Sequence, residues 1–255
     1  MSNPTRITSS LTFLLLLASI GVGINSCHGI HAGKNLEVRS GNHVASQVIY
    51  QSDPLSRLLA GGYHNGLTTL GELKALGDFG LGTFDDYRGG EMLILGGVIF
   101  SIPNPETSVP VSDTKLKTPF AMVTRFRPTQ EVKLKQVEDY PALQKLLDSH
   151  FDPQKTYAIS VEGVFHNLKV QAVRPPTEIG LPFEKISHAK AEFSDVSARF
   201  AGFRFGGEEA KTNHLTYHFH GRTQKGQGGH ILDFQKAGPI TVRWQEASEV
   251  VVLHP

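Results

Sequence analysis

The predicted fold depends on residues 216–234, which read Thr216-Tyr217-His218-Phe219-His220, then GRTQKGQGG (221–229), then His230-Ile231-Leu232-Asp233-Phe234. In a β-strand alternate side chains point to the same face, so His218 and His220 share one face. The run between the two segments is rich in residues that reverse a chain. The pattern therefore predicts a β-hairpin whose second strand brings His230 beside the first two histidines.

Three imidazoles that converge with one side open are the usual ligands of a catalytic divalent metal ion. The alternative is a chance exposed His-x-His pair, but His230 follows Gly228-Gly229 and begins an apolar run, which favours a metal site. His214 lies on the same predicted face, four residues before His218. It is either a fourth imidazole or, as we expect, a solvated residue at the strand entrance.

The composition limits the function classes that fit this chain. A length of 255 residues permits one large domain or two small ones. A formal charge of +1 gives no indication of a nucleic-acid groove. The 26 Gly and 14 Pro favour many turns and a β-rich architecture. Twelve His residues are a mild indication of metal chemistry.

The first residues resemble an export signal. Arg6 precedes a short apolar run at residues 11–24, which fits the core of a secretory signal better than a membrane span. Cys27, the only cysteine, excludes an intrachain disulfide. We expect a signal peptide at 1–27, a linker at 28–46 and one domain at 47–255. The chain is expected to be secreted, with lipid attachment through Cys27 as the alternative.

Short strands dominate the rest of the chain. We expect them at 48–50, around a Gly96-Gly97 turn within 89–102, and at 118–126, 157–165, 167–173, 191–205, 240–244 and 249–253. Helices are predicted at 70–76, where Thr69 and Glu72 form a capping box, at 140–147, and after Asp53-Pro54. Asp53 is the expected cap of that last helix and Gly61-Gly62 its end.

These elements predict an α+β or mainly β fold of two packed sheet layers with few short helices, and with the metal site on a hairpin of the C-terminal half. Residues 103–117, rich in Pro and Ser, are expected to form a loop. Glu91 begins a strand that looks buried. It is either an edge residue facing water or a carboxylate of the site.

Several of these motifs together resemble the alpha-acetolactate decarboxylase family. They are Leu70-Gly71-Glu72-Leu73-Lys74, the run 77–84 (GDFGLGTF), Gly90-Glu91-Met92, the run 117–121 (KTPFA), Tyr217-His218-Phe219-His220 and the run 228–234 (GGHILDF). The resemblance extends from about residue 50 to about residue 255. Short matches in the family's order are far more specific together than any one of them.

The resemblance implies an activity and a set of site residues. Members convert (S)-2-acetolactate, and also 2-acetohydroxybutyrate, to an acetoin-type product, (R)-acetoin for the first, and carbon dioxide. They use a divalent metal, usually zinc, and neither thiamine nor pyridoxal. The family's metal ligands match His218, His220 and His230, and a glutamate for proton handling matches Glu91. A carboxy-lyase that acts on a small-molecule substrate is therefore expected. The sequence does not decide whether the protein is a monomer or a homodimer.

One departure from the family pattern concerns the substrate carboxylate. The family places an arginine near the metal, and the matching position here is Gln171, an uncharged amide. Arg174, three residues on, faces the opposite way on a regular strand and reaches the site only across a bulge. Gln171 and Arg174 are thus candidate site residues. The alternative function is a secreted metal-binding or sensory relative without turnover.

Overall fold

The computed structural model describes residues 39–40, 47–60, 65–176, 178, 181–213 and 215–255. The predicted signal peptide, Cys27, the Gly61-Gly62 helix end and His214 lie outside the described residues. Most of the predicted linker also does, although β1 (Arg39–Ser40) falls within it. In the described part of the chain, no helix has the length and apolar character needed to cross a membrane.

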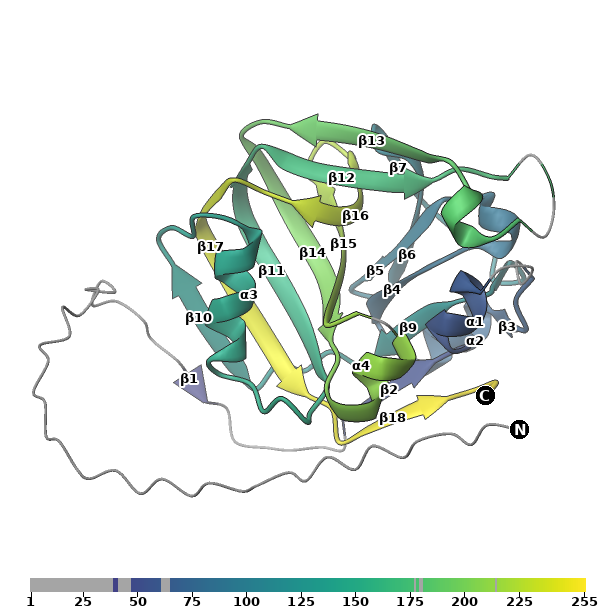
Figure 1. Ribbon diagram of the computed structural model, residues 1–255, viewed down its shortest axis with the longest axis horizontal. Coiled ribbons are helices and arrows are strands. Elements are labelled where there is room, and N and C mark those ends of the chain that lie inside the picture. Colours follow the sequence, from purple (N-terminus) through teal and green to yellow (C-terminus); the bar gives the residue numbers. More distant parts are fainter. Residues whose placement is uncertain (1–38, 41–46, 61–64, 177, 179–180, 214) are drawn as a thin grey trace, which may run out of the picture. The chain divides into compact units, whose positions relative to one another are not determined.

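Nine strands form the larger sheet, and all its neighbouring pairs are antiparallel (Figure 1). Their spatial order is β1, β10 (Gln130–Leu134), β17 (Lys236–Glu246), β11 (Tyr157–His166), β14 (Val196–Arg204), β15 (Tyr217–Thr223), β16 (Gly228–Asp233), β12 (Leu168–Val173) and β13 (His188–Phe193). The predicted histidine hairpin is the β15–β16 pair of this sheet.

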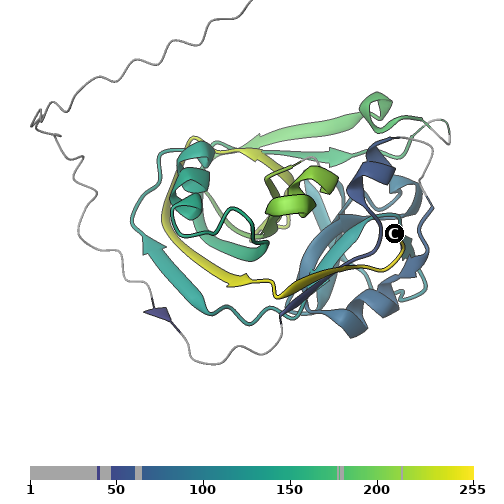
Figure 2. The same cartoon turned by 60° about the horizontal axis from the view of Figure 1, so that its bottom comes forward.

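Seven strands form the second sheet, in which only the β18–β2 pair is parallel. The order is β18 (Glu249–Val252), β2 (Val48–Gln51), β9 (Ala121–Thr124), β4 (Phe79–Thr83), β5 (Glu91–Leu95), β6 (Val98–Asn104) and β7 (Thr107–Pro110). β3 (Thr68–Thr69) and β8 (Lys117–Thr118) make a separate two-stranded ribbon. The chain passes from β17 of the first sheet directly into β18 of the second (Figure 2).

In the described part of the chain, four short α-helices and two 3-10 turns accompany the sheets: α1 (Leu55–Leu59), α2 (Leu70–Leu76), α3 (Tyr140–Asp148), α4 (Gly207–Asn213), η1 (Asp85–Tyr87) and η2 (Phe183–Lys185). The capping box of α2 is present, with Thr69 Oγ1 accepting from the Glu72 N–H and the Glu72 carboxylate accepting from the Thr69 N–H. The prediction of a mostly β protein with few short helices and more than one sheet is confirmed.

Three apolar clusters set the layers. One packs α3 on the outer face of the nine-stranded sheet through Leu143 and Leu147. A second packs α2 on the outer face of the seven-stranded sheet through Leu70 and Leu73. The third lies between the sheets, where β12, β14, β15 and β16 contact β4, β5 and β6. The site described below lies in this middle layer.

Two local predictions are corrected. Residues 103–117 are not a loop throughout, because β6 runs to Asn104 and β7 pairs with it as an edge strand, where Pro is tolerated. Asp53 does not cap α1; Pro54 is the cap residue, and the Asp53 carboxylate instead pairs with Arg57. The sequence analysis also missed β10 and α4, which lack a clear apolar period.

The turn between β5 and β6 was predicted correctly. Gly96 and Gly97 have φ values of +59° and +79°, the left-handed pair that a tight two-residue hairpin turn requires. The turn sets the β5–β6 register, in which Glu91 lies opposite Ile102.

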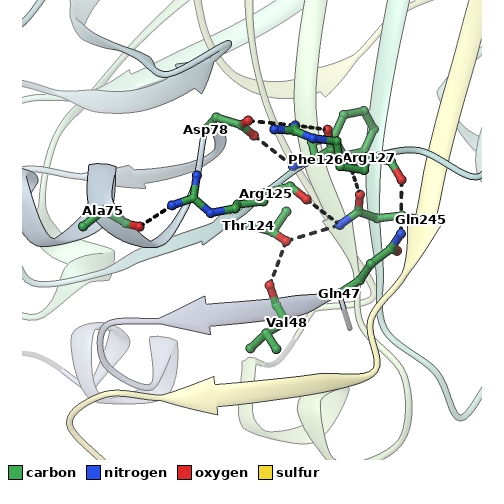
Figure 3. A network of polar contacts seen from close by, with 9 residues as sticks. All are labelled: Gln47, Val48, Ala75, Asp78, Thr124, Arg125, Phe126, Arg127 and Gln245. Carbon is green, nitrogen blue, oxygen red and sulfur yellow. Dashed lines mark hydrogen bonds and ion pairs between the residues drawn. The ribbon is translucent and has the colours of Figure 1, made fainter. Parts of the chain in front are cut away.

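A buried amide links the two sheets away from the site (Figure 3). Gln245 of β17 is fully buried, and its Nε2 donates to Thr124 Oγ1 at 3.2 Å and to the Arg125 carbonyl at 3.3 Å. Its Oε1 accepts from the Arg127 N–H. Thr124 Oγ1 in turn donates a hydrogen bond to the Val48 carbonyl at 2.7 Å, so Gln245 and Thr124 together link β17 to β9 and β2.

Replacing Gln245 by Leu should lower the free energy of unfolding by about 2–3 kcal/mol, because the Arg127 N–H and the Arg125 carbonyl lose their buried partner. Urea unfolding measures the change. Gln136→Leu is the matched control, since Gln136 is exposed and bonds only the Glu138 side chain among the described residues. Equal losses in the two variants would contradict a special role for the buried amide.

Candidate metal centre

Strand β15 places His218 and His220 on the face that looks toward the second sheet. Tyr217 and Phe219, at the alternate positions, pack in the outer apolar cluster with α3. The period of two therefore sends the aromatic side chains to one face and the imidazoles to the other. Both histidines are buried, with 6% and 2% of their surface exposed. Phe120, the residue before β9 of the second sheet, stacks on the His218 ring, with centroids 6.1 Å apart.

Strand β16 adds His230, which lies directly opposite His220 in the register of the hairpin. Gly229, just before it, has a φ of +148°, and a Cβ there would lie 2.3 Å from the Gln171 carbonyl oxygen of β12. Only glycine allows the backbone of β16 to approach β12 this closely. The close approach keeps His230 in the row of side chains that faces the second sheet.

The three imidazoles converge. The ring centroid of His218 lies 4.9 Å from the ring centroid of His220 and 4.9 Å from that of His230. The ring centroids of His220 and His230 are 5.5 Å apart. One nitrogen from each ring lies within 4.8 Å of the others. These three side chains can hold one metal ion.

Hydrogen bonding orients the ring nitrogens. His220 Nδ1 lies 2.8 Å from the Met92 carbonyl, so that nitrogen carries the proton and Nε2 presents its lone pair to the cluster. His218 Nε2 lies 3.1 Å from His220 Nε2. His218 Nδ1 is buried and has no hydrogen-bond partner among the described residues. A cation shared by the two Nε2 atoms fits this arrangement.

Burial keeps the imidazoles neutral. Desolvation lowers the pKa of His218 well below its usual value, that of His220 to about 3 and that of His230 to about 4, and repulsion among neighbouring histidines adds to the effect. Neutral imidazole is the form that binds a metal ion, so at neutral pH no proton has to be displaced from these rings.

Glu91 lies beside the cluster. It begins β5, where Leu93 and Leu95 share its face, and this face looks into the layer between the sheets. Its Oε1 accepts from the Val173 N–H at 3.1 Å, and its Oε2 lies 3.6 Å from His220 Nε2. Burial raises the pKa of this carboxyl to about 8, while the Val173 hydrogen bond opposes the shift. In this environment Glu91 is protonated at pH 7.

A cavity of about 210 Å³ opens over these groups. Its polar lining is Thr83, Tyr87, Glu91, Gln171 and the three histidines, and its apolar wall includes Leu55, Leu58, Phe120 and Phe183. Among the described residues that line it there is neither Lys nor Arg. The cavity is thus a mainly apolar space with neutral polar groups gathered at one wall.

The two further candidates from the sequence lie differently. Gln171 lines the cavity and is directly opposite His230 in the β12–β16 register. Arg174 is exposed, does not line the cavity, and donates its backbone N–H to the Ser187 carbonyl. The structure therefore brings Gln171, but not Arg174, next to the imidazoles.

Sequence reasoning missed several groups of the site. The Met92 carbonyl orients His220, yet every residue has a carbonyl, so no sequence signal marks this one. Tyr87 reaches the cavity from η1, and Phe183 from η2. Both turns follow no periodic pattern, and only the tertiary fold brings them to the site.

The fold and the site together define a class: a β-rich protein of two packed sheets, with three neutral imidazoles able to hold a metal ion in a buried cavity. The sequence profile of the alpha-acetolactate decarboxylase family matches residues 49–255, and the chain belongs to this family of carboxy-lyases.

Individual members of the family are similar to this chain in sequence and in structure. The alpha-acetolactate decarboxylase of Methylococcus capsulatus is 36% identical over 196 residues, 75% of this chain and 74% of that protein. That of Methanosarcina mazei is 34% identical over 218 residues, 80% of this chain and 74% of that protein. The crystal structure of acetolactate decarboxylase from Bacillus subtilis subspecies spizizenii superimposes with a TM-score of 0.75 at 25% identity, over 82% of this chain and 90% of that one.

The raised pKa of Glu91 predicts a pH-dependent stability in chelator-treated protein. The folded state binds the Glu91 proton more tightly than the unfolded state, where the pKa is near 4.5. The contribution to stability is therefore complete below pH 4.5 and is lost as the pH rises through about 8. Relative to Glu91→Gln, which is neutral at every pH, the wild type should lose stability on the order of a few kcal/mol over this range.

Urea unfolding of both proteins at several pH values between 4.5 and 8.5 measures the difference. The three imidazoles are common to both proteins, so their own titration largely cancels in the comparison. A difference in unfolding free energy that stays constant across the range would contradict a neutral, buried Glu91.

Proposed function

We propose that the chain decarboxylates (S)-2-acetolactate to (R)-acetoin and carbon dioxide, with a divalent metal ion, zinc in the first place, held by His218, His220 and His230. Family membership supports the reaction class. The observation that supports the metal is the convergence of three neutral imidazole nitrogens at one wall of a cavity. Three neutral nitrogen ligands with an open side suit zinc in a catalytic site.

When bound there, the metal ion would supply Lewis-acid stabilisation of the negative charge that develops on the substrate as carbon dioxide leaves. The electron pair of the broken carbon–carbon bond passes to the neighbouring ketone, so no organic electron sink is needed. The apolar wall formed by Leu55, Leu58 and Phe120 keeps water from this charge, and electrostatic interactions are stronger in such an environment.

Glu91 is the proposed proton donor. In the metal-free protein its buried carboxyl holds a proton at neutral pH, and it lies in the cavity wall beside His220. It delivers this proton to the carbon that lost carbon dioxide and becomes a carboxylate, which solvent reprotonates before the next turnover. The reaction then consumes one proton for each acetolactate anion converted to neutral acetoin. The Val173 N–H stabilises the carboxylate between these steps.

Replacing His218, His220 or His230 by Ala should remove the bound metal and reduce acetoin formation by at least a thousandfold, because each supplies one of three ligands. Metal analysis and acetoin assay of the purified variants measure both effects. His150→Ala is the matched control, since His150 is exposed and contacts Trp244 instead. A His230→Ala protein with full zinc content would contradict the three-ligand site.

A second experiment measures metal content and acetoin from racemic acetolactate on one sample of residues 28–255. We expect about one metal ion per chain and acetoin formation that stops when a chelator removes the metal. Metal bound without any acetoin formed would overturn the decarboxylase proposal. It would favour the non-catalytic relative, which the neutral Gln171 in the cavity wall suggests as the alternative.

A further inference from the structure

Among the described residues, the cavity lining carries no positive side chain, although the proposed substrate is an anion. Its described lining contains no Lys or Arg, and Gln171 is neutral. An acid that enters a mainly apolar cavity loses much of its hydration and needs a charged partner for its carboxylate. The inference below rests on the proposed function. It identifies the cation of this chain that can pair with the substrate carboxylate.

The pairing register of four strands places one lysine on the face of the histidine cluster. His220 of β15 lies opposite His230 of β16, His230 lies opposite Gln171 of β12, and Gln171 lies opposite Lys190 of β13. Directly opposed residues of antiparallel strands point to the same face. The four side chains therefore form one row across the sheet, and Lys190 is the cationic end of the row that begins at the metal centre.

The spacing suits a small bridging ligand. Opposed Cβ atoms are about 5 Å apart, so the Lys190 Cβ lies two steps, roughly 10 Å, from that of His230. The flexible four-carbon stem of lysine can bring its ammonium group back over Gln171. A hydroxyketo acid lying over Gln171 can then face the imidazoles with one end and the ammonium group with its carboxylate.

Two other cations near this row have partners of their own, and a third lies past a strand end. Lys169 pairs with the Asp233 carboxylate at 3.3 Å. Arg222 lies over the Phe100 ring and donates to Ser108, and Arg174 is exposed beyond the end of β12. Lys190 is exposed on the edge strand, and no carboxylate of the described residues forms an ion pair with it.

The charge of Lys190 acts in the space next to the site. His188, two residues before it on the same face, has its pKa lowered by burial first and by the Lys190 charge as well. His188 in turn contributes to the lowered pKa of His230. Lys190 therefore lies within electrostatic range of His188, and His188 lies within electrostatic range of His230.

We propose that Lys190 is the residue that binds the substrate carboxylate, with the Gln171 amide as its uncharged neighbour. The group it binds leaves as neutral carbon dioxide, so the ion pair weakens as the transition state forms. An interaction of this kind stabilises bound substrate at least as much as the transition state, and its loss should raise KM more than it lowers kcat.

Kinetics of three variants test the proposal. Lys190→Met should raise the KM for acetolactate about tenfold and change kcat less than threefold, with an unchanged metal content. Lys190→Arg should stay within threefold of wild type. Lys236→Met, at an exposed position of β17 in the same sheet, is the control and should change neither constant.

In the Lys190→Met background, Gln171→Arg should restore the low KM, because it places a cation one step nearer the metal centre. An unchanged KM in Lys190→Met would overturn the proposal.

Binding measurements separate this proposal from the decarboxylase activity. The probe is 2,3-dihydroxy-2-methylbutanoate, in which an alcohol replaces the ketone, so that the carboxylate is kept but cannot be lost by the same route. Calorimetry should show about tenfold weaker binding to Lys190→Met than to wild type. Acetoin, which has no carboxylate, should bind both proteins equally. Equal weakening for both ligands would overturn the role of Lys190, while a wild type that binds the acid and makes no acetoin would overturn the activity only.

Discussion

The hydrogen bond from His220 Nδ1 to the Met92 carbonyl is the interaction on which the site depends, because it crosses from one sheet to the other. The Met92 backbone is held on both sides by pairing with Gly82 and Ser101, so its carbonyl is a fixed acceptor. The bond therefore fixes both the tautomer and the rotation of the ring, and it directs Nε2 toward His218. It also brings Glu91, the residue before Met92, to 3.6 Å from that same nitrogen.

Burial between the sheets determines protonation throughout the site. Desolvation penalises whichever form is charged, so it lowers the pKa of the imidazoles and raises that of the carboxyl. Bases and acid are consequently both neutral at pH 7 in the metal-free protein, so the imidazoles can accept a dication and Glu91 carries a proton. A single physical cause, burial between two sheets, thus prepares two different chemical roles.

The candidate metal ligands and the proposed anion-binding residues lie on different parts of the large sheet. The histidines lie on β15 and β16, both inside the sheet, whereas Gln171 and Lys190 lie on β12 and on the edge strand β13. A neutral Gln171 next to the imidazoles leaves their low pKa values undisturbed by a nearby fixed charge. Positive charge at the solvent-facing edge costs little desolvation, and a flexible lysine can move it to a ligand when one is bound.

The sequence by itself determined the features that depend on local chemistry: the capping box of α2, the Gly96-Gly97 turn, the strand character of most segments, and the shared face of His218 and His220. It could not reveal β10, α4, the β7 edge or the cavity groups Tyr87 and Phe183, since these form through pairing and packing between distant segments. Family motifs named Glu91, yet only the packing of β5 against β15 made it a buried acid. Which cation shares the face of the histidine cluster was likewise decided by the tertiary structure, because strand register, and not distance along the chain, places Lys190 opposite Gln171.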